Sequence, residues 1–209
     1  METIWVMKIN TNTWNIIRYT IYTPFYDLIG RVLTKSRRKS IEMLNIQPGD
    51  KVLIVGAGTG LDLEIIHHKC EITATDITPA MIVALKRKSK RLKRDVNAMV
   101  MDGQLLKFED DSFDCVILHL ILAVIPDPVA CYKEAERVLK PGGHMAIFDK
   151  LLQKHQKPSL LRRMLNPITN LLFSNICRSF SSIYKHSNMK VKSDITSFWG
   201  LFRIIILKK

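Results

Sequence analysis

KVLIVGAGTG, Lys51–Gly60, is the stretch that decides the fold of this chain. Its apolar run, Val52–Val55, has the length of a buried parallel strand. A turn rich in glycine follows and lets another molecule approach the backbone closely. Its glycines are Gly56, Gly58 and Gly60. Residues Leu61–His68 can continue as a helix, whose N-terminal N–H groups and dipole would favour an anionic group.

The spacing of these glycines separates two classes of ligand. A dinucleotide-binding turn has the pattern G-x-G-x-x-G, and its third glycine would fall at position 61, which is Leu61. The pattern here is G-x-G-x-G. By itself such a turn can also be no more than a tight loop, so it needs support from residues downstream.

Strand-like and helix-like runs alternate between Asp50 and Asp149. The strand-like runs, in order, are VLIV, EITAT, NAMVM, DCVILHL and HMAIF. This alternation predicts an α/β fold with a doubly wound parallel sheet that binds its ligand at the carboxyl ends of the strands.

Two acidic residues stand at the predicted strand ends. Asp76 follows Glu71–Thr75, about 20 residues after the first glycine, where a carboxylate can bond ribose hydroxyls. Asp102 follows Ala98–Met101, where it could accept a hydrogen bond from an adenine amino group. The next residue, Gly103, would leave room for the ring.

Three stretches carry a resemblance to a known family. They are the G-x-G-x-G turn, DGQLLKFEDDSFDCVILHLILAVIPDP and ERVLKPGGHMAIFD. They resemble the motifs of class I S-adenosylmethionine (SAM)-dependent methyltransferases, in particular the quinone-biosynthesis and phospholipid N-methyltransferases, over about residues 22–207. The resemblance implies a Rossmann-like, seven-stranded sheet of order 3-2-1-4-5-7-6 with strand 7 antiparallel and an N-terminal helical cap.

The resemblance also implies that SAM is the cofactor. The residues that would bind it are Gly56, Gly58, Gly60, Asp76, Ile77, Asp102, Gly103 and His119. One position departs from the family pattern: the residue two before the first glycine is usually acidic and is Ile54 here. This departure leaves the affinity for SAM, and activity itself, open.

We expect a single domain, residues 1–209, large enough to form a core without disulfides or metal. By the resemblance, residues 1–44 form the helical cap, 45–150 the cofactor-binding core, and 151–209 the acceptor lid and closing strands. Proline should interrupt the helical pattern at Pro24 in the cap and at Pro167 in the lid.

Methyl transfer mainly requires that donor and acceptor are aligned and that water is excluded, with a base needed only for some acceptors. The side chains that could assist are Tyr22, Tyr26 and His119. The alternative is that Tyr26 packs the first helices onto the sheet and that His119 is a packed residue at a strand end. No metal site is expected, because the neighbouring His67 and His68 have no further ligand pattern around them.

The net charge of +13 is unevenly distributed. Seven of the nine residues in Lys86–Arg94 are basic, and Asp194 is the only acid between Leu151 and Lys209. This asymmetry indicates an anionic partner, which could be a lipid head-group surface, a nucleic acid or an acidic substrate. Nucleic acid is the less favoured partner, because no appended RNA-binding module is visible.

Several features predict a cytoplasmic protein, with peripheral attachment to the inner face of the membrane as a further option. The first ten residues lack a signal-peptide pattern, and the longest apolar stretch, Cys115–Ile125, is too short to span a bilayer. The four cysteines are scattered without a C-x-x-C pair, as expected for a reducing compartment.

For the acceptor, the sequence favours a lipid or another small hydrophobic molecule. The N-terminal YTPFYD, the AVIPDPV segment and the C-terminal FWGLFRIIILKK resemble phospholipid N-methyltransferases, which implies transfer to a lipid amine such as phosphatidylethanolamine. The alternatives are a quinone or small-molecule methyltransferase, or a SAM-binding protein without catalysis. The oligomeric state stays open.

Overall fold

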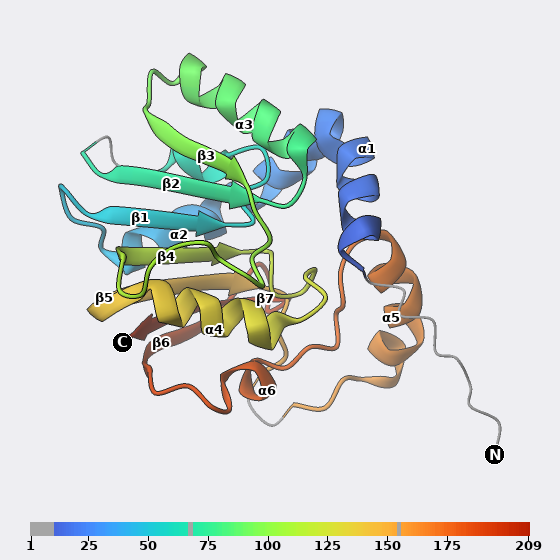
Figure 1. Ribbon diagram of the computed structural model, residues 1–209. Coiled ribbons are helices and arrows are strands. Elements are labelled where there is room, and N and C mark those ends of the chain that lie inside the picture. The colour runs from blue at the N-terminus through green and yellow to red at the C-terminus, as the bar shows by residue number, and fades with distance from the viewer. Residues whose placement is uncertain (1–10, 67–68, 154–155) are drawn as a thin grey trace.

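The computed structural model describes residues 11–66, 69–153 and 156–209 (Figure 1). Residues 1–10 and the pair His67 and His68, on which the sequence analysis made predictions, lie outside the described residues.

Seven strands form one sheet in the order β3-β2-β1-β4-β5-β7-β6. The pairs that β7 makes with β5 and β6 are antiparallel, and the other pairs are parallel. The predicted strand order and the antiparallel seventh strand are therefore confirmed. The strands are β1 Lys51–Val55, β2 Glu71–Asp76, β3 Val96–Val100, β4 Phe113–His119, β5 Leu139–Asp149, β6 Lys190–Ser197 and β7 Phe202–Lys208.

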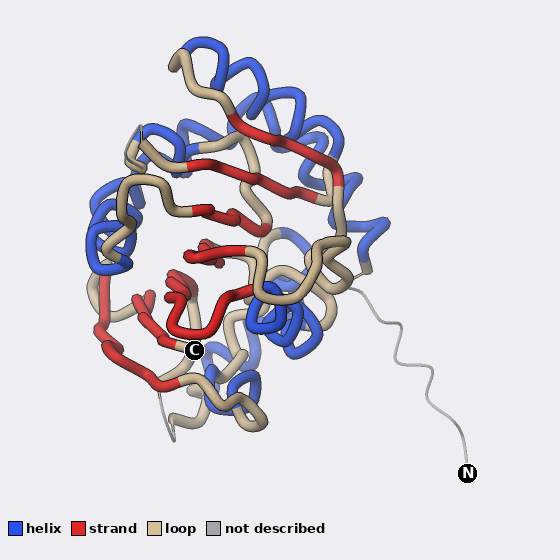
Figure 2. The backbone as a smooth tube through the Cα atoms, turned by 60° about the vertical axis from the view of Figure 1, so that its left-hand side comes forward, coloured by secondary structure: helices blue, strands red, loops and turns tan. Residues whose placement is uncertain are grey.

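Helices cover both faces of this sheet, as the tube drawing shows (Figure 2). They are α1 Asn12–Gly30, α2 Thr34–Leu44, α3 Pro79–Arg91, α4 Pro128–Val138, α5 Leu160–Leu172 and α6 Phe180–Tyr184, with 3₁₀ turns at Arg31–Leu33 and Leu61–Glu64.

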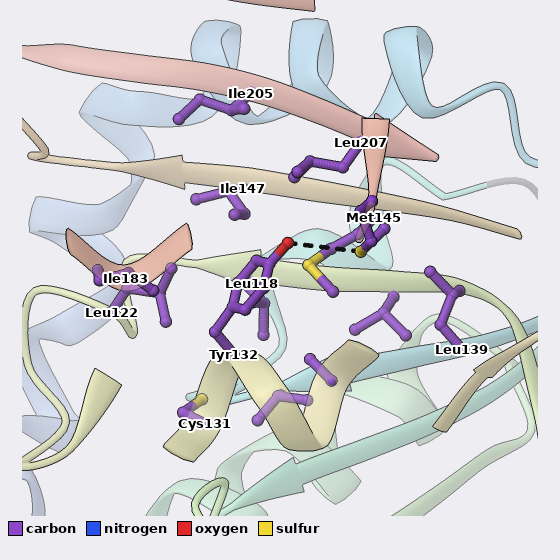
Figure 3. Packing of buried hydrophobic residues seen from close by; sticks show 14 of the residues in the cluster. Leu118, Leu122, Cys131, Tyr132, Leu139, Met145, Ile147, Ile183, Ile205 and Leu207 are labelled. Atoms are coloured by element: carbon purple, nitrogen blue, oxygen red, sulfur yellow. Dashed lines mark hydrogen bonds between the residues drawn. The ribbon is translucent and has the colours of Figure 1, made fainter. Parts of the chain in front are cut away.

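Alternate residues of the central strands point into two separate cores. In β1, Leu53 and Val55 face the core that includes residues of α4 and α6, whereas Val52 and Ile54 face the core that includes residues of α2 and α3. Neither face of a central strand is left to solvent, which is why these strands read as continuous apolar runs. Figure 3 shows the first core, where Cys131 and Tyr132 of α4 lie against the sheet.

Both predicted helix breaks are wrong. Pro24 lies inside α1 and Pro167 inside α5, and each helix continues through its proline. A proline removes one backbone donor and crowds one carbonyl. Here α1 is fixed on both sides of Pro24, because Asp27 pairs with Lys88 of α3 at 2.8 Å and Trp14 donates to the Leu171 carbonyl of α5 at 2.7 Å. Tertiary contacts thus outweigh the local preference.

The helix expected from Leu61 is also different in the structure. Leu61–Glu64 is a 3₁₀ turn, closed by bonds such as that from Leu63 N to the Gly60 carbonyl at 3.2 Å. A single 3₁₀ turn carries little of the aligned dipole of an α-helix. Any anion-binding role of the glycine turn must therefore rest on its individual N–H groups.

The C-terminal end of α5 meets the first half of α1 beyond the carboxyl ends of β1 to β4 (Figure 1). Side chains of α1 donate to successive carbonyls at the end of α5: Arg18 to Asn170 and Leu171, Tyr22 to Leu172, and Tyr19 to Phe173. No described helix is both long and apolar enough to cross a membrane.

Candidate functional site

A cavity opens at the carboxyl ends of the first four strands, where the doubly wound topology places ligands. It encloses roughly 620 Å³, a volume that includes the solvent in its open mouth. Its wall combines the glycine turn, the ends of β2 and β3, the loop after β4 and one side of α1. The lining residues are Asn12, Asn15, Tyr19, Tyr26, Gly56, Gly58, Asp76, Ile77, Thr78, Met81, Met101, Asp102, Gly103, His119, Leu120, Ile121, Val124 and Ile125.

The glycine turn supplies two of its three glycines to this cavity. Gly56 and Gly58 have φ values of +68° and +55°, which side chains rarely adopt. A Cβ at Gly56 would stand 2.5 Å from the Ile121 side chain, and one at Gly58 would stand 3.3 Å from the Tyr26 ring. Gly60 does not line the cavity, since a Cβ there would point at Leu63 and Leu85.

Asp76 fixes the turn to the end of β2. Its two carboxylate oxygens accept hydrogen bonds from the backbone N–H groups of Gly58, at 2.9 Å, and Thr78, at 2.8 Å. Burial raises the pKa of Asp76, although both backbone bonds oppose this shift. Each oxygen keeps a second lone pair, so the carboxylate can still accept from a ligand hydroxyl in the cavity.

Asp102 and Gly103 stand at the β3 side of the cavity. Asp102 accepts a hydrogen bond from Asn12 Nδ2 at 2.6 Å and is also bonded by Gln104. A Cβ at Gly103 would come within 2.8 Å of Val55, so this glycine permits the loop to lie close to β1. Asn12 of α1 therefore closes the cavity over the acid that was expected to contact an adenine.

His119 is 3% exposed, and both ring nitrogens have partners. Nδ1 lies 3.0 Å from Asp62 Oδ1, and Nε2 lies 2.9 Å from Ser40 Oγ. Beside a carboxylate the Nδ1 atom is the donor, which leaves Nε2 to accept from Ser40 in the neutral ring. His119 borders the cavity, but this arrangement favours the packed interpretation of its side chain over a free base.

Asp62 is the centre of this buried network. Arg37 of α2 donates through one nitrogen to both Asp62 oxygens, at 2.9 and 3.0 Å. Burial opposes ionisation, but the charge of Arg37 and the bond from His119 hold the pKa of Asp62 well below its usual range. The network ties α2 to the glycine turn and to the end of β4.

The two candidate tyrosines are in different places. Tyr26 lines the cavity, and burial raises the pKa of its hydroxyl, so Tyr26 is neutral at physiological pH. Tyr22 does not line it and donates to the Leu172 carbonyl at 2.9 Å. Tyr19, which the sequence analysis did not select, lines the cavity instead. A signal was present: Asn12, Asn15, Tyr19 and Tyr26 share one helical face.

Ile54, the residue that departs from the family pattern, is 1% exposed and packs in the core between the sheet and helices α2 and α3. No carboxylate stands at this position. Within the described part of the chain, no group of three or more His, Cys, Asp and Glu side chains is placed to hold a metal ion.

Comparisons with known proteins agree with this geometry. Residues 53–147 match the family model of the methyltransferase domain. The chain contains a SAM-dependent methyltransferase domain. The residues of this domain fit that cofactor: glycines without room for a Cβ, an acid after β2 for ribose hydroxyls and an acid after β3 for the adenine amino group. The role of each residue stays a prediction.

Two curated relatives with different acceptors resemble this methyltransferase domain. The phosphatidylethanolamine N-methyltransferase of Cereibacter sphaeroides is 29% identical over 143 residues, 68% of each chain. The demethylmenaquinone methyltransferase of Corynebacterium glutamicum (strain R) is 36% identical over 128 residues. That match covers 58% of this chain and only 53% of the relative, so this chain spans about half the relative's length.

Among solved structures, the [4+2]-cyclase SpnF has a TM-score of 0.80 and 13% identity, with 96% of each chain covered. A likeness at this identity shows the fold alone. Since SpnF is described as a cyclase, the fold does not define the reaction or the acceptor.

Proposed function

We propose that this methyltransferase transfers the methyl group of SAM to the amine of a membrane phospholipid, such as phosphatidylethanolamine, at an anionic membrane surface. The observation that carries the proposal is the set of exposed apolar side chains on α1, whose other side lines the cavity, and on α5, whose end contacts α1.

The outer side of α1 is apolar and exposed. Its side chains recur every three or four residues, which puts them on one helical face. Exposure reaches 76% at Leu28 and 68% at Phe25. The members are Ile17, Ile21, Phe25 and Leu28, and Val32 is also exposed in the 3₁₀ turn that follows α1. The opposite side of the same helix lines the cavity, so a single helix separates the apolar face from the site.

The neighbouring α5 has the same character. None of its residues is buried, and its exposed apolar side chains include Leu160, Leu161, Met164, Leu165 and Ile168. Packing within the chain does not account for apolar side chains on an exposed helical face, and such faces mark interaction sites. We call the exposed apolar side chains of these two helices the α1–α5 face. An apolar face of this kind can enter the boundary between lipid head groups and acyl chains.

Basic side chains accompany the α1–α5 face. Arg163 on α5 is exposed, and Arg31, Lys35 and Arg38 are exposed just after α1. Each basic residue near an anionic leaflet contributes about 1 kcal/mol of attraction. Together with the net charge of +13, this arrangement favours an anionic lipid surface as the partner.

The proposed methyl transfer requires little of the chain beyond positioning the methyl donor and the acceptor. SAM supplies an activated methyl group together with its leaving group. Tyr19, Tyr26 and Ile121 wall the cavity and would exclude water, while the glycine turn and Asp76 would fix the donor. An amine attacks in its neutral form and releases a proton, which needs a route to water more than a dedicated base.

The relatives support a second candidate. The demethylmenaquinone methyltransferases are more similar in sequence over a shorter length, and a quinone ring would also reach the cavity from the α1–α5 face. Ile54, a buried residue where the family usually has an acid, supports a third candidate function: a domain that binds SAM without transferring its methyl group.

Label transfer from radioactive SAM distinguishes these candidates. The protein is incubated with vesicles that contain phosphatidylethanolamine and an anionic lipid, or with a demethylated menaquinone in neutral vesicles, and the lipids are separated before counting. Label in phosphatidylethanolamine is the expected result. Label only in the quinone would move the assignment to the second candidate. Label in neither, with SAM binding retained in calorimetry, would support the third.

A further inference from the structure

Arg18 is a buried cation without an acidic partner among the described residues. Its side chain lies in the contact between α1 and α5 and is 2% exposed. One terminal nitrogen donates to the carbonyls of Asn170, at 3.0 Å, and Leu171, at 3.1 Å. The Nε atom and the second terminal nitrogen are buried and have no hydrogen-bond partner within residues 11–66, 69–153 and 156–209.

A role in holding α5 explains only part of this arrangement. Cations are favourable at the C-terminal end of a helix, where carbonyls lack partners. However, Trp14 Nε1 already donates to the Leu171 carbonyl at 2.7 Å, and Tyr19 and Tyr22 donate to the next two carbonyls. A neutral donor would suffice at this position, and a buried charge that lacks a counter-ion is costly. The unused donors of Arg18 therefore point to a ligand.

The position of Arg18 fits the acceptor more closely than the cofactor. Its helix neighbours Asn15 and Tyr19 line the cavity, whereas the residues expected to bind SAM lie on the glycine turn and at the ends of β2, β3 and β4. Arg18 faces α5 instead, and α5 carries part of the α1–α5 face. A lipid that entered between these helices would pass Arg18 before its amine reached the cavity.

We propose that Arg18 binds the phosphate of the acceptor phospholipid through Nε and its second terminal nitrogen. The planar guanidinium presents parallel N–H groups, which match two phosphate oxygens, and phosphate is the one anionic group next to the amine in phosphatidylethanolamine. The inference rests on the proposed function and deepens it, because a quinone has no phosphate. Arg18 would thus select phospholipids over quinones.

Access to Arg18 requires that α5 moves. Since α5 has no buried side chain, its displacement would expose little additional core. Its last carbonyls are held by side chains of α1, and water or lipid head groups can replace those bonds. The basic residue that a phosphate needs is therefore covered by the end of a helix that buries none of its own side chains.

The test compares Arg18→Gln and Arg18→Lys with the parent. The substrates are phosphatidylethanolamine vesicles and vesicles doped with oleylamine, a lipid amine without phosphate. Hydrogen bonds to a charged group are worth about 1.5–3 kcal/mol, so we expect Arg18→Gln to raise the KM for phosphatidylethanolamine by about 10- to 100-fold. Its KM for oleylamine and its affinity for SAM should stay within about twofold, and Arg18→Lys should recover part of the loss. The matched control is Arg87→Gln, an exposed arginine on α3, which has no part in the α1–α5 face.

A direct binding measurement keeps the inference separate from the proposed activity. Calorimetry with glycerophosphoethanolamine, which has the phosphate but no acyl chains, should show binding to the parent and none to Arg18→Gln; inorganic phosphate serves as the second probe. Binding of inorganic phosphate alone would assign the site to free phosphate and overturn the lipid assignment. Equal KM changes for both lipid amines, or equal glycerophosphoethanolamine binding by parent and variant, would make Arg18 purely structural. A parent that binds the probe but methylates no lipid would overturn the proposed function and leave the phosphate site standing.

Discussion

The Tyr26 ring lies directly against Gly58, with its Cε1 atom 3.3 Å from the point that a Cβ at position 58 would occupy. The first helix and the glycine turn therefore meet inside the cavity, and a Cβ at position 58 would fit only if the Tyr26 ring shifted by a few tenths of an ångström. This contact explains why the sequence places a glycine at position 58 and an aromatic residue on α1 at position 26.

Gly58→Val should abolish SAM binding in calorimetry while the protein remains folded. The branched side chain would occupy the cavity, and its backbone would be strained at φ +55°. Gly49→Val is the matched control, since Gly49 also has a positive φ of +88° but no described residue has an atom within 4 Å of a Cβ there. It should lose some stability and keep SAM affinity. Equal SAM affinity in Gly58→Val and parent would show that the cofactor binds elsewhere.

Asp76→Ala should weaken SAM binding by about 1.5–3 kcal/mol, the worth of hydrogen bonds to a charged group. The substitution also removes the acceptor for Gly58 N and Thr78 N, so Asp76→Asn, which keeps one acceptor oxygen, should lose less. Calorimetric titration with SAM measures both. As a control, Asp114→Ala removes a carboxylate that also accepts a backbone bond, from Lys51 N at 2.9 Å, but does not line the cavity. A normal affinity in both Asp76 variants would contradict the site.

Asp62→Asn should reduce the free energy of unfolding by about 3–5 kcal/mol at pH 7, because Arg37 would stay buried without its counter-charge. The pKa of Asp62 is lowered in the folded protein. Its carboxylate therefore stabilises the fold above the ordinary aspartate pKa of about 3.9, and this contribution is lost as the pH falls from about 5. Urea unfolding at pH 7 and pH 3 should show a smaller gap between parent and variant at pH 3.

The double variant Arg37→Met/Asp62→Leu provides the control for this network. Replacing a buried ion pair by apolar residues of similar volume is often neutral. We expect it to be more stable than Asp62→Asn at pH 7. A double variant as unstable as Asp62→Asn would mean that packing around Ser40 and His119 depends on the charges themselves.

The α1–α5 face should bind anionic vesicles more strongly than neutral ones, and salt should weaken this preference as the screening length falls from about 8 Å at 0.15 M to about 3 Å at 1 M. Phe25→Ser combined with Met164→Ser should reduce vesicle binding by at least about tenfold, because each substitution removes apolar area that lipid would cover. Val83→Ser on α3, which also replaces a half-exposed apolar residue, should have no effect. Equal sedimentation with neutral and anionic vesicles at low salt would refute membrane selection by charge.

Tyr26→Phe should lower the rate of methyl transfer by less than the roughly 10²- to 10⁴-fold typical of losing a general base. The ring would still cover Gly58, and an amine acceptor needs no dedicated base. Tyr22→Phe is the comparison, since its hydroxyl bonds the Leu172 carbonyl outside the cavity. A drop of 10³-fold or more in Tyr26→Phe alone, with SAM affinity unchanged, would make Tyr26 catalytic.

The sequence patterns by themselves determined the alternation of strands and helices and the edge of the sheet at which the site lies, and the resemblance to a known family added the strand order. Buried parallel strands are apolar on both faces, and glycines and acids follow them directly in the chain. These signals are local, so they can be recognised from the amino-acid sequence without the tertiary structure. For this reason Gly56, Gly58, Asp76, Asp102 and Gly103 were expected where the structure places them, around one cavity.

Contacts between distant segments were decided only by the tertiary structure. The bonds from α1 to the end of α5 join residues at least 150 positions apart. Together with the pairing of Asp27 and Lys88, they carry the first helix through Pro24, against its local preference. The Asp62–His119–Ser40 network likewise joins three elements and occupies both nitrogens of the histidine that sequence reasoning had offered as a base. A linear pattern records which residues can form such bonds. Only packing decides which of them meet, because the free energy of burying a polar group depends on the partner that the fold brings to it.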